Sequence, residues 1–316
     1  MPSKLPLVLI IGPTAVGKTE IAIQLAERLN GEIVSADSRL LYRGMDIGTA
    51  KPTPEERKRV QHHLIDIAEP DEILSLAVFQ QKARSLITDI HSRGKLPFLV
   101  GGTGQYIHAV TRGWKPPEVI PNERLRKELE KLALSHSEGV GKERGQQWLH
   151  ARLEFLDPDA AAGIDARNMR RIIRALEVIF TTGRKFSEQR RQSESPYRLI
   201  TIGLTRPRPE LYARIDARID SMFASGFLDE VKSLLAKGCS PALPSMSAIG
   251  YRECVEALEG RITVEEAKQA IRRATRIFVR RQANWFKESN ANIQWFRPSV
   301  GVEEEIEKFI RKMIDF

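Results

Sequence analysis

The sequence predicts an α/β fold in which a doubly wound parallel sheet carries an inserted all-helical domain and is followed by a helical C-terminal region. Short apolar runs alternate with amphipathic segments of helical periodicity through the first third of the chain, a pattern typical of repeated βα units. The pattern after that third is helical, and prolines at 116, 117, 121 and 196 interrupt it. An apolar run returns at 197–204, so we expect the chain to return to the sheet there.

The first apolar run has the pattern of a strand that is buried on both faces. It covers residues 7–11 and ends at Gly12, and the segment after it has apolar residues at helical spacing until Gly31 stops it. The elements expected in the first third are strand 7–11, helix 19–30, strand 32–36, strand 62–67, helix 77–93 and strand 96–100.

The other two thirds are expected to be mostly helical. Residues 123–195 show helical periodicity without a convincing strand, and residues 209–316 are mostly helical as well. We therefore expect a core of residues 1–114 and 198–316, with a helical insertion at 115–197.

Composition narrows the class of protein only slightly. The chain has 316 residues with 50 Lys and Arg against 41 Asp and Glu, a formal net charge of +9 that favours a polyanionic partner only weakly. No apolar run approaches the roughly 20 residues that cross a bilayer, and no secretory signal is visible, so we expect no membrane partner. Two cysteines cannot form a disulfide framework or a four-cysteine zinc site. We expect a cytoplasmic protein, and a monomer because nothing demands a multimer.

The loop after the first strand carries a phosphate-binding motif, G-x-x-x-x-G-K-[ST]. Its glycines let backbone N–H groups turn toward an anion, and the start of the next helix adds partial positive charge. Its lysine places an ammonium on a phosphate, and its final hydroxyl is a typical Mg²⁺ ligand. The strand before it and the helix after it make the core P-loop NTPase-like. The motif consists of Gly12, Pro13, Thr14, Ala15, Val16, Gly17, Lys18 and Thr19.

The acid expected of an ordinary nucleotide hydrolase is missing from its usual place. Strand 96–100 ends in Gly101-Gly102-Thr103-Gly104, without a carboxylate. The apolar strand that does end in an acid is the second, at Asp37, which we expect at the carboxyl end of a strand beside the P-loop strand. Asp37 and Thr103 are therefore site candidates, although either residue alone is also explained as a helix cap or turn residue.

Positive charge gathers in residues 267–287, where no acidic residue occurs. At 100° per residue, Arg272, Arg276 and Arg280 form one stripe that Arg273 joins. Ile271, Phe278 and Trp285 fall on the opposite side, so one face can pack while the other meets an anion. The alternative is a face that is solvated or paired within the protein.

A second basic group lies in the insertion. Arg167, Arg170, Arg171 and Arg174 have the spacing of a single helical face, opposite Ile172, Leu176 and Ile179. They are candidates for nucleic-acid phosphates or for acidic groups of the same protein. Basic residues continue at Arg184, Lys185, Arg190 and Arg191.

A third pair, Arg214 and Arg218, is spaced four apart on a predicted helix. These side chains reach a diphosphate or pair with Asp216 and Asp220, and the spacing does not separate the two options.

Six motifs along the chain together resemble the tRNA dimethylallyltransferase family, whose members alkylate an adenosine beside the anticodon. The run at 37–52 is the most specific of the six, and residues 131–165 match least. The zinc-finger extension of eukaryotic members is absent, so the resemblance is to the bacterial form. The motifs lie at 12–19, 37–52, 62–67, 100–104, 174–178 and 249–253.

The resemblance implies transfer of a dimethylallyl group from dimethylallyl diphosphate to N6 of adenosine 37 in tRNA, with Mg²⁺ as cofactor. It implies Asp37 as general base, Thr103 near the reacting groups, and Lys18, Arg214 and Arg218 with the P-loop at the diphosphate. Thr19 would be the metal ligand. The tRNA contacts implied are Asp37, Ser38, Arg39, Leu40, Thr103, Arg126, Arg170, Arg171, Ile172, Ile173, Arg174, Ser247, Ala248, Ile249, Gly250, Tyr251 and Arg252.

Three other functions compete with this interpretation. A small-molecule P-loop kinase would share the loop and the sheet, but the glycines at 101–104 count against it. A non-catalytic RNA-binding protein would not need an intact P-loop beside Asp37. A relative that alkylates free adenylate would not need the basic insertion.

Overall fold

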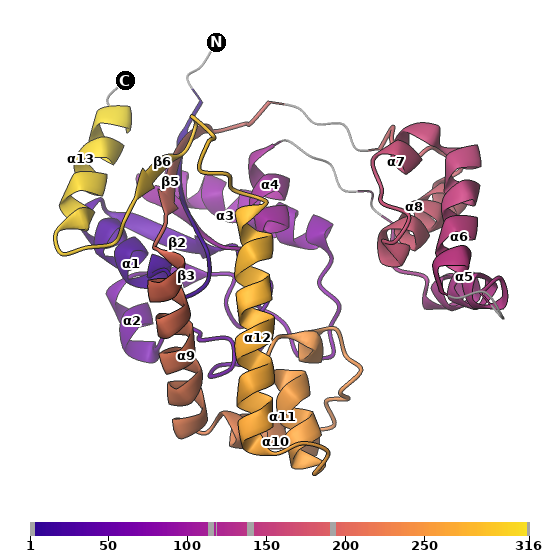
Figure 1. Ribbon diagram of the computed structural model, residues 1–316. Coiled ribbons are helices and arrows are strands. Elements are labelled where there is room, and N and C mark those ends of the chain that lie inside the picture. Colours follow the sequence, from indigo (N-terminus) through magenta and orange to yellow (C-terminus); the bar gives the residue numbers. More distant parts are fainter. Residues whose placement is uncertain (1–3, 113–116, 118, 138–141, 190–193, 315–316) are drawn as a thin grey trace. The chain divides into compact units, whose positions relative to one another are not determined.

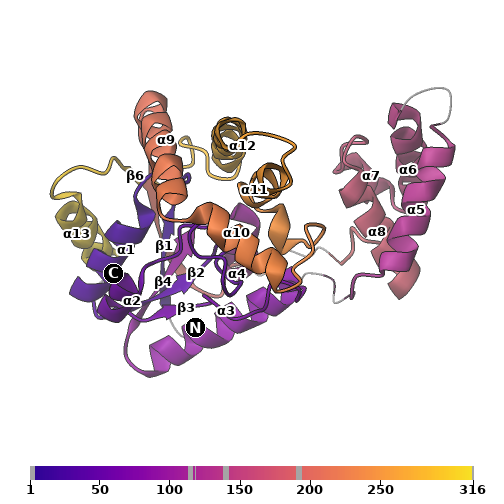
Figure 2. The same cartoon turned by 90° about the horizontal axis from the view of Figure 1, so that it is seen from below.

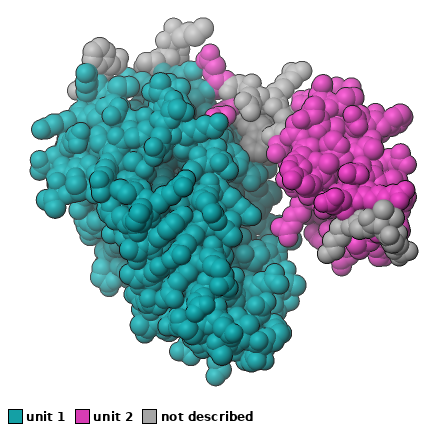
Figure 3. All heavy atoms as spheres, viewed as in Figure 1, with its two compact units in different colours: residues 1–111, 195–316 teal, residues 112–194 magenta. Residues whose placement is uncertain are grey.

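The computed structural model describes residues 4–112, 117, 119–137, 142–189 and 194–314. It divides into two compact units, and Figure 3 shows their atoms in different colours. Unit 1 consists of residues 1–111 and 195–316, and unit 2 of residues 112–194. The boundary expected between 114 and 115 falls on residues outside the described ranges.

Unit 1 is built on a parallel sheet, shown in Figure 1, with strands in the order β3-β2-β4-β1-β5-β6. This confirms the predicted α/β class. We expected the P-loop strand β1 to be adjacent to β2, the strand that precedes Asp37. This expectation is wrong, because β4 lies between them. The strands are β1 Pro6–Ile11, β2 Gly31–Ser35, β3 His62–His63, β4 Leu96–Gly101, β5 Arg198–Leu204 and β6 Gln294–Phe296.

One predicted strand is too long, and one short strand was not predicted. The strand expected at 62–67 stops after His63, because Leu64 and Asp66 adopt left-handed backbone angles with φ of 60° and 55°. Asp66 turns back to accept hydrogen bonds from Lys51 and Arg57. The short β6 lies in a region expected to be mostly helical, and three residues are too few to show a strand pattern.

Side chains of the central strands alternate between two apolar layers, so helices cover both faces of the sheet. Val8 and Ile10 belong to the layer that includes Ile23 of α1, while Leu7 and Leu9 belong to the layer that includes Phe79 of α3. The helices of unit 1 are α1 Lys18–Arg28, α2 Pro54–Arg59, α3 Leu76–Ser92, α4 Gly104–Thr111, α9 Arg208–Ala224, α10 Phe227–Ala236, the 3₁₀ turn η1 Ser245–Ser247, α11 Tyr251–Leu258, α12 Val264–Ala283 and α13 Val302–Ile314.

The regular elements of unit 2 in its described residues are helices, and the unit has a core of its own. Leu153 of α6 and Ile172 and Leu176 of α8 are almost fully buried there. The buried Asp157 carboxylate accepts hydrogen bonds from the N–H and hydroxyl of Ser187 and from Ala160 N. The helices are α5 Glu123–Ser135, α6 Lys142–Leu156, α7 Pro158–Ala162 and α8 Met169–Thr182. No helix in the described part of the chain has both the length and the apolar character needed to cross a membrane.

Candidate functional site

The P-loop joins β1 to α1 through backbone angles that favour glycine. Gly17 has φ of 108° and caps the start of α1. At Gly12, φ is 150° and an added Cβ would lie 2.6 Å from the carbonyl oxygen of Leu204 in β5. Gly12 is therefore required by the packing of the loop against β5, and Gly17 by the turn into the helix.

Lys18 folds back over the loop that precedes it. Its Nζ donates hydrogen bonds to the carbonyl oxygens of Gly12, at 3.0 Å, and Pro13, at 2.7 Å. Burial lowers the pKa of Lys18 to about 8, although the Asp37 carboxylate acts in the opposite direction. The ammonium lacks an anionic partner at hydrogen-bond distance among the described residues, and a bound phosphate would supply one.

Two arginines of α9 reach the same loop. Arg214 Nε donates to Ala15 O at 2.9 Å, and Arg218 lies 3.4 Å from the Thr14 hydroxyl. The acids of α9 face elsewhere, since Asp216 and Asp220 accept from arginines of α12. Of the two options that the sequence left open, the geometry therefore favours placement of Arg214 and Arg218 beside the P-loop.

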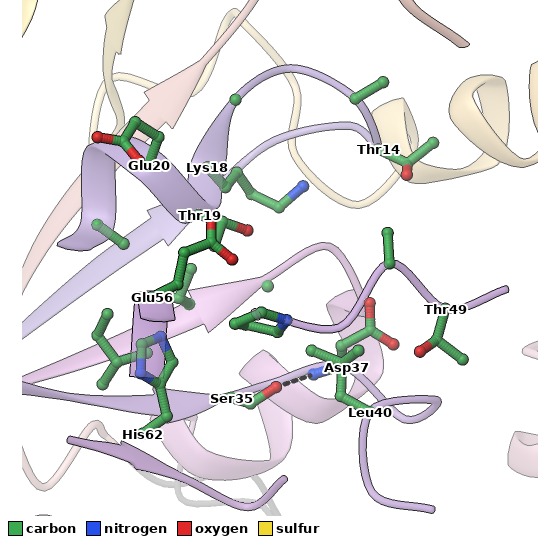
Figure 4. A pocket seen from close by; sticks show the side chains of 18 of the residues that line it. Thr14, Lys18, Thr19, Glu20, Ser35, Asp37, Leu40, Thr49, Glu56 and His62 are labelled. Carbon is green, nitrogen blue, oxygen red and sulfur yellow. Dashed lines mark hydrogen bonds between the residues drawn. The ribbon is translucent and has the colours of Figure 1, made fainter. Parts of the chain in front are cut away.

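A cavity of about 590 Å³, here called the P-loop cavity, opens beside these groups. Figure 4 shows Lys18 and Thr14 on the P-loop side of it and Asp37 on the opposite side. Arg214 and Arg218 also line it. Glu20, Asp37 and Glu56 line the cavity too, so it is the P-loop side, with three cationic side chains and the start of a helix, that is suited to an anion such as a diphosphate.

Asp37 follows β2 and forms a local turn. Its Oδ1 accepts from Arg39 N at 2.9 Å, and its own N–H lies 3.3 Å from the Ser35 hydroxyl. Among the described residues Oδ2 has no hydrogen-bond donor. One carboxylate oxygen thus supports the turn while the other is available to a ligand, so the turn and base interpretations are compatible.

A second cavity, of about 480 Å³, lies beside α12 and is here called the α12 cavity. Both cavities are lined by Thr14, Ala15, Asp37, Thr49 and Arg218. The two spaces therefore meet at Asp37. The α12 cavity is also lined by Ser38, Arg39, Gly48, Thr103, Ile215, Ile219, Met222, Phe227, Ser247, Ala248, Ile249, Ile271, Ala274, Thr275, Ile277, Phe278 and Arg281.

The segment after Asp37 is held by side chains that the sequence did not single out. Glu230 of α10 accepts from the N–H groups of Asp46, Ile47 and Gly48 and from the Tyr251 hydroxyl. The three backbone contacts join residues 182 to 184 positions apart, so no local sequence pattern predicts them. The segment that lines both cavities is therefore fixed from outside the site.

Arg39 bonds this segment to the chain around η1, since its guanidinium donates to Pro244 O and to the Ser247 hydroxyl. Lys51, whose side chain is buried, donates to Tyr42 O and pairs with Asp46 and Asp66.

The residues predicted to contact tRNA divide into two groups within unit 1. Ser38, Arg39, Thr103 and the residues at 247–249 line the α12 cavity, and Leu40 lines the P-loop cavity. The other group does not reach either cavity. Gly250 and Tyr251 are buried beneath α10, and Arg252 is exposed and pairs with Glu256. Tyr251 is thus explained by packing and by its bond to Glu230.

Several residues predicted to contact tRNA in unit 2 are buried or are paired within the protein. The side chains of Ile172 and Ile173 lie in the core, with 0% and 3% exposure, and cannot reach an RNA. Arg126 and Arg174 both bond the buried carboxylate of Glu177.

The expected arginine face of this unit is smaller than the spacing suggested. Arg167 precedes α8 and pairs with Asp165, so it is not part of the helical face. Arg170 and Arg171 are exposed and have no acidic partner in the described ranges. Arg190 and Arg191 lie outside those ranges.

Two of the four arginines of the α12 stripe are paired within the protein. Figures 1 and 2 show α9 and α12 side by side, and Asp220 and Asp216 of α9 bond Arg272 and Arg276, both at 2.6 Å. Of the two options that the sequence left open, the structure therefore favours pairing within the protein for these two arginines. Phe278 and Trp285, expected to pack, are 37% and 46% exposed, and Phe278 lines the α12 cavity.

The Thr19 hydroxyl fits the magnesium role only together with a bound phosphate. Thr19 is exposed and lines the P-loop cavity. The described residues contain no group of three or more His, Cys, Asp or Glu side chains that could hold a metal ion. Mg²⁺ commonly binds through substrate phosphates, water and one or two protein oxygens, which is the kind of site that Thr19 offers.

A glycine-rich loop between a central parallel strand and a helix, with cationic side chains around it, defines a P-loop protein of the phosphate-binding class. Residues 40–289 match the IPP transferase family. The tRNA dimethylallyltransferase of Roseiflexus sp. (strain RS-1) is 52% identical over 98% of this chain and 99% of its own length, and that of Thermomicrobium roseum is 44% identical over 100% and 94%.

Solved structures agree with these relatives. The tRNA isopentenylpyrophosphate transferase of Bacillus halodurans is 46% identical, with a TM-score of 0.72 over 99% of this chain and 97% of its own. A eukaryotic dimethylallyltransferase whose structure describes action on tRNA is 26% identical, with a TM-score of 0.77 over 98% and 78%. The chain belongs to the tRNA dimethylallyltransferase family, which confirms the resemblance noted in its motifs, and it is an enzyme of that family.

Proposed function

We propose that this enzyme transfers a dimethylallyl group from dimethylallyl diphosphate to the exocyclic N6 amine of adenosine 37 in tRNA. The observation that carries the proposal is the meeting of two cavities at Asp37. One is lined by cationic groups suited to a diphosphate. The other is lined by apolar and polar groups suited to a base that has left its stack. A donor and an acceptor in the two cavities would meet beside one carboxylate.

The P-loop side would stabilise the leaving group. As the C–O bond of the allylic diphosphate breaks, its electron pair leaves with pyrophosphate, and negative charge grows there. Lys18, Arg214 and Arg218 line the space where that charge develops. Preorganised cations lower the barrier because they need not reorient during the reaction. Mg²⁺ held by Thr19 and the phosphates would neutralise further charge.

Asp37 would accept the proton that the amine loses. The N6 lone pair is delocalised into the adenine ring, so the amine is a weak nucleophile, and removal of its proton as the C–N bond forms assists the attack. In the balanced step, N6 bonds to the alkyl carbon, pyrophosphate departs, and the N6 proton passes to the Asp37 carboxylate. Thr103, which lines the α12 cavity, would hydrogen-bond near the reacting groups.

The tRNA would reach this carboxylate through the α12 cavity. Arg281 lines the cavity and has no ion pair among the described residues, so it is available to a phosphate. Arg170 and Arg171 of unit 2 are exposed, and they too have no ion pair among the described residues. These side chains would position the RNA backbone without reading its sequence.

The test is an alkylation assay with mass detection. Purified enzyme, Mg²⁺ and dimethylallyl diphosphate should add one five-carbon group to a tRNA that carries adenosine at position 37. The same tRNA with guanosine there is the matched control and should gain no mass. Free adenylate replaces the tRNA in a third arm. Alkylation of adenylate but not of any tRNA would refute the proposed acceptor, and no alkylation in any arm would refute the proposed transfer.

A further inference from the structure

Gln282, near the end of α12, joins the P-loop to the end of β4. Its Oε1 accepts from Thr14 N at 2.9 Å, and its Nε2 donates to Gly102 O at 3.1 Å. The side chain is 5% exposed. A buried amide that is bonded at both ends to backbone groups of two different loops has a fixed position.

The glycine at 102 is what allows the amide to fit there. An added Cβ on Gly102 would lie 2.2 Å from Gln282 Nε2 and 3.1 Å from Gly12 O. The first turn of the P-loop, Gly102 and Gln282 thus form one tightly packed group. The glycine-rich end of β4 is explained here by close packing against α12 rather than by contact with phosphate.

The amide oxygen occupies a donor that a P-loop ordinarily offers to its ligand. Backbone N–H groups of such a loop form the cradle for phosphate oxygens. An oxygen 2.9 Å from Thr14 N stands where a phosphate oxygen bound to that N–H would stand. The carbonyls of Gly12 and Pro13 in the same half of the loop hold Lys18 Nζ.

Thr14 and Ala15 line the P-loop cavity, and so does the helix end of the loop. Gly17, Lys18 and Thr19, at the start of α1, line that cavity, whereas Gln282 does not. Gln282 therefore closes the loop behind Thr14 and leaves the helix end for the ligand. As a result, fewer backbone N–H groups of the P-loop are available to bind a chain of phosphates.

We propose that Gln282 is a specificity-determining residue that limits this P-loop to a diphosphate. It occupies the Thr14 N–H, which is then not available to a third phosphate, and the partial negative charge of its amide oxygen repels that phosphate. The proposal rests on the proposed function, in which the leaving group is pyrophosphate. It adds the means by which the loop excludes triphosphates, including nucleotides.

The test compares binding of inorganic pyrophosphate and inorganic triphosphate to the full-length enzyme in excess Mg²⁺, by titration calorimetry. The wild-type enzyme should bind pyrophosphate at least tenfold more tightly. Gln282→Ala removes the acceptor and opens space, so the ratio of the two Kd values should shift at least tenfold toward triphosphate. Gln282→Glu keeps an acceptor and adds negative charge, so the ratio should shift at least threefold the opposite way.

Gln80→Ala is the matched control, because Gln80 is a buried glutamine of α3 whose amide donates to Ala109 O in α4. Its ratio should equal that of the wild type. Equal weakening of both ligands by Gln282→Ala would overturn the inference, since it would indicate a structural role alone. If that variant does not fold, an unchanged ratio in Gln282→Glu overturns it. No tRNA or alkyl transfer enters the measurement, so failure of the alkylation assay is recorded separately.

Discussion

The P-loop cavity and the arginine-rich helices α8 and α12 both contain many basic side chains, but their partners differ. Lys18, Arg214 and Arg218 donate to carbonyl and hydroxyl oxygens of the loop, and no carboxylate of the described residues bonds them. On α12, by contrast, Arg272 and Arg276 bond aspartates of α9. A count of positive charges does not separate these cases. What separates them is whether an acid from another element already satisfies each cation.

The largest effect should come from Asp37, where the two cavities meet. Asp37→Asn keeps an oxygen that can accept from Arg39 N but removes the base, so turnover should fall about 10²-fold or more. Pyrophosphate affinity should change little. Single-turnover alkylation and calorimetry measure the two quantities. Near-normal turnover in Asp37→Asn, with loss only in Asp37→Ala, would assign Asp37 to the turn instead.

The next largest effect should come from Glu177, whose carboxylate pairs with two arginines that were predicted to contact RNA. Glu177 is fully buried and bonds Arg126, Arg174 and Asn122 N. Glu177→Ala should reduce the free energy of unfolding of unit 2 by about 2 kcal/mol, because charged hydrogen bonds are lost. Hydrogen exchange of α5 and α8 amides measures it. Glu154→Ala, at an exposed position of α6, should have no such effect, and equal exchange in the two variants would show that the Glu177 network is not stabilising.

The third effect is a pH dependence at Lys18, whose pKa is lowered to about 8 by burial. The group carries its proton below that pH and loses it above, so pyrophosphate affinity should be level below pH 8. Above it, affinity should fall by about tenfold per pH unit until the pKa of the complex is reached. Calorimetry from pH 6.5 to 9.5 tests this. The pyrophosphate affinity of Lys18→Met should show only the pH dependence that comes from titration of pyrophosphate itself. If the affinity of both proteins begins to fall at the same pH, Lys18 is not the cause.

The smallest effect compares two arginines of one helix. Arg281 lines the α12 cavity without an ion pair among the described residues, while Arg272 is bonded to α9. Arg281→Ala should weaken tRNA binding a few-fold and lower the slope of log K against log salt by about 1, as loss of one phosphate contact does. Arg272→Ala should leave the slope unchanged. Binding curves measured at a series of salt concentrations give both slopes. If only Arg272→Ala lowers the slope, then Arg272 and not Arg281 contacts the phosphate.

The parts of the fold that could be predicted from the sequence depend on short-range patterns. The apolar run before Gly12 and the motif through Thr19 define a strand, a loop and a helix within a few residues, and the structure places them so. The motif around Asp37 is similarly local. Strand order is not local, and so the expected adjacency of the strands before Gly12 and Asp37 was wrong.

The parts that could not be predicted depend on partners far away in the sequence. Gln282 accepts a hydrogen bond from Thr14 N, and Glu230 accepts from backbone N–H groups at 46–48. The sequence around these residues does not indicate either contact. The arginines of α12 were expected to face an anion because no acid occurs at 267–287, yet Asp216 and Asp220 come from another helix. Helical spacing assigns a face but does not identify what covers that face.

The pairing of β1 with β5 has a consequence for the growing polypeptide during translation. β1 is made from residues 6–11, but β5 comes from residues 198–204, after all of unit 2 has been synthesised. Until then one edge of β1 presents unpaired backbone groups, which invite association with other chains. Ribosomes add roughly 5–20 residues per second, so that edge stays open for about ten to forty seconds in every new molecule. Proteins that cover nascent strands would therefore be needed most while the insertion is being made.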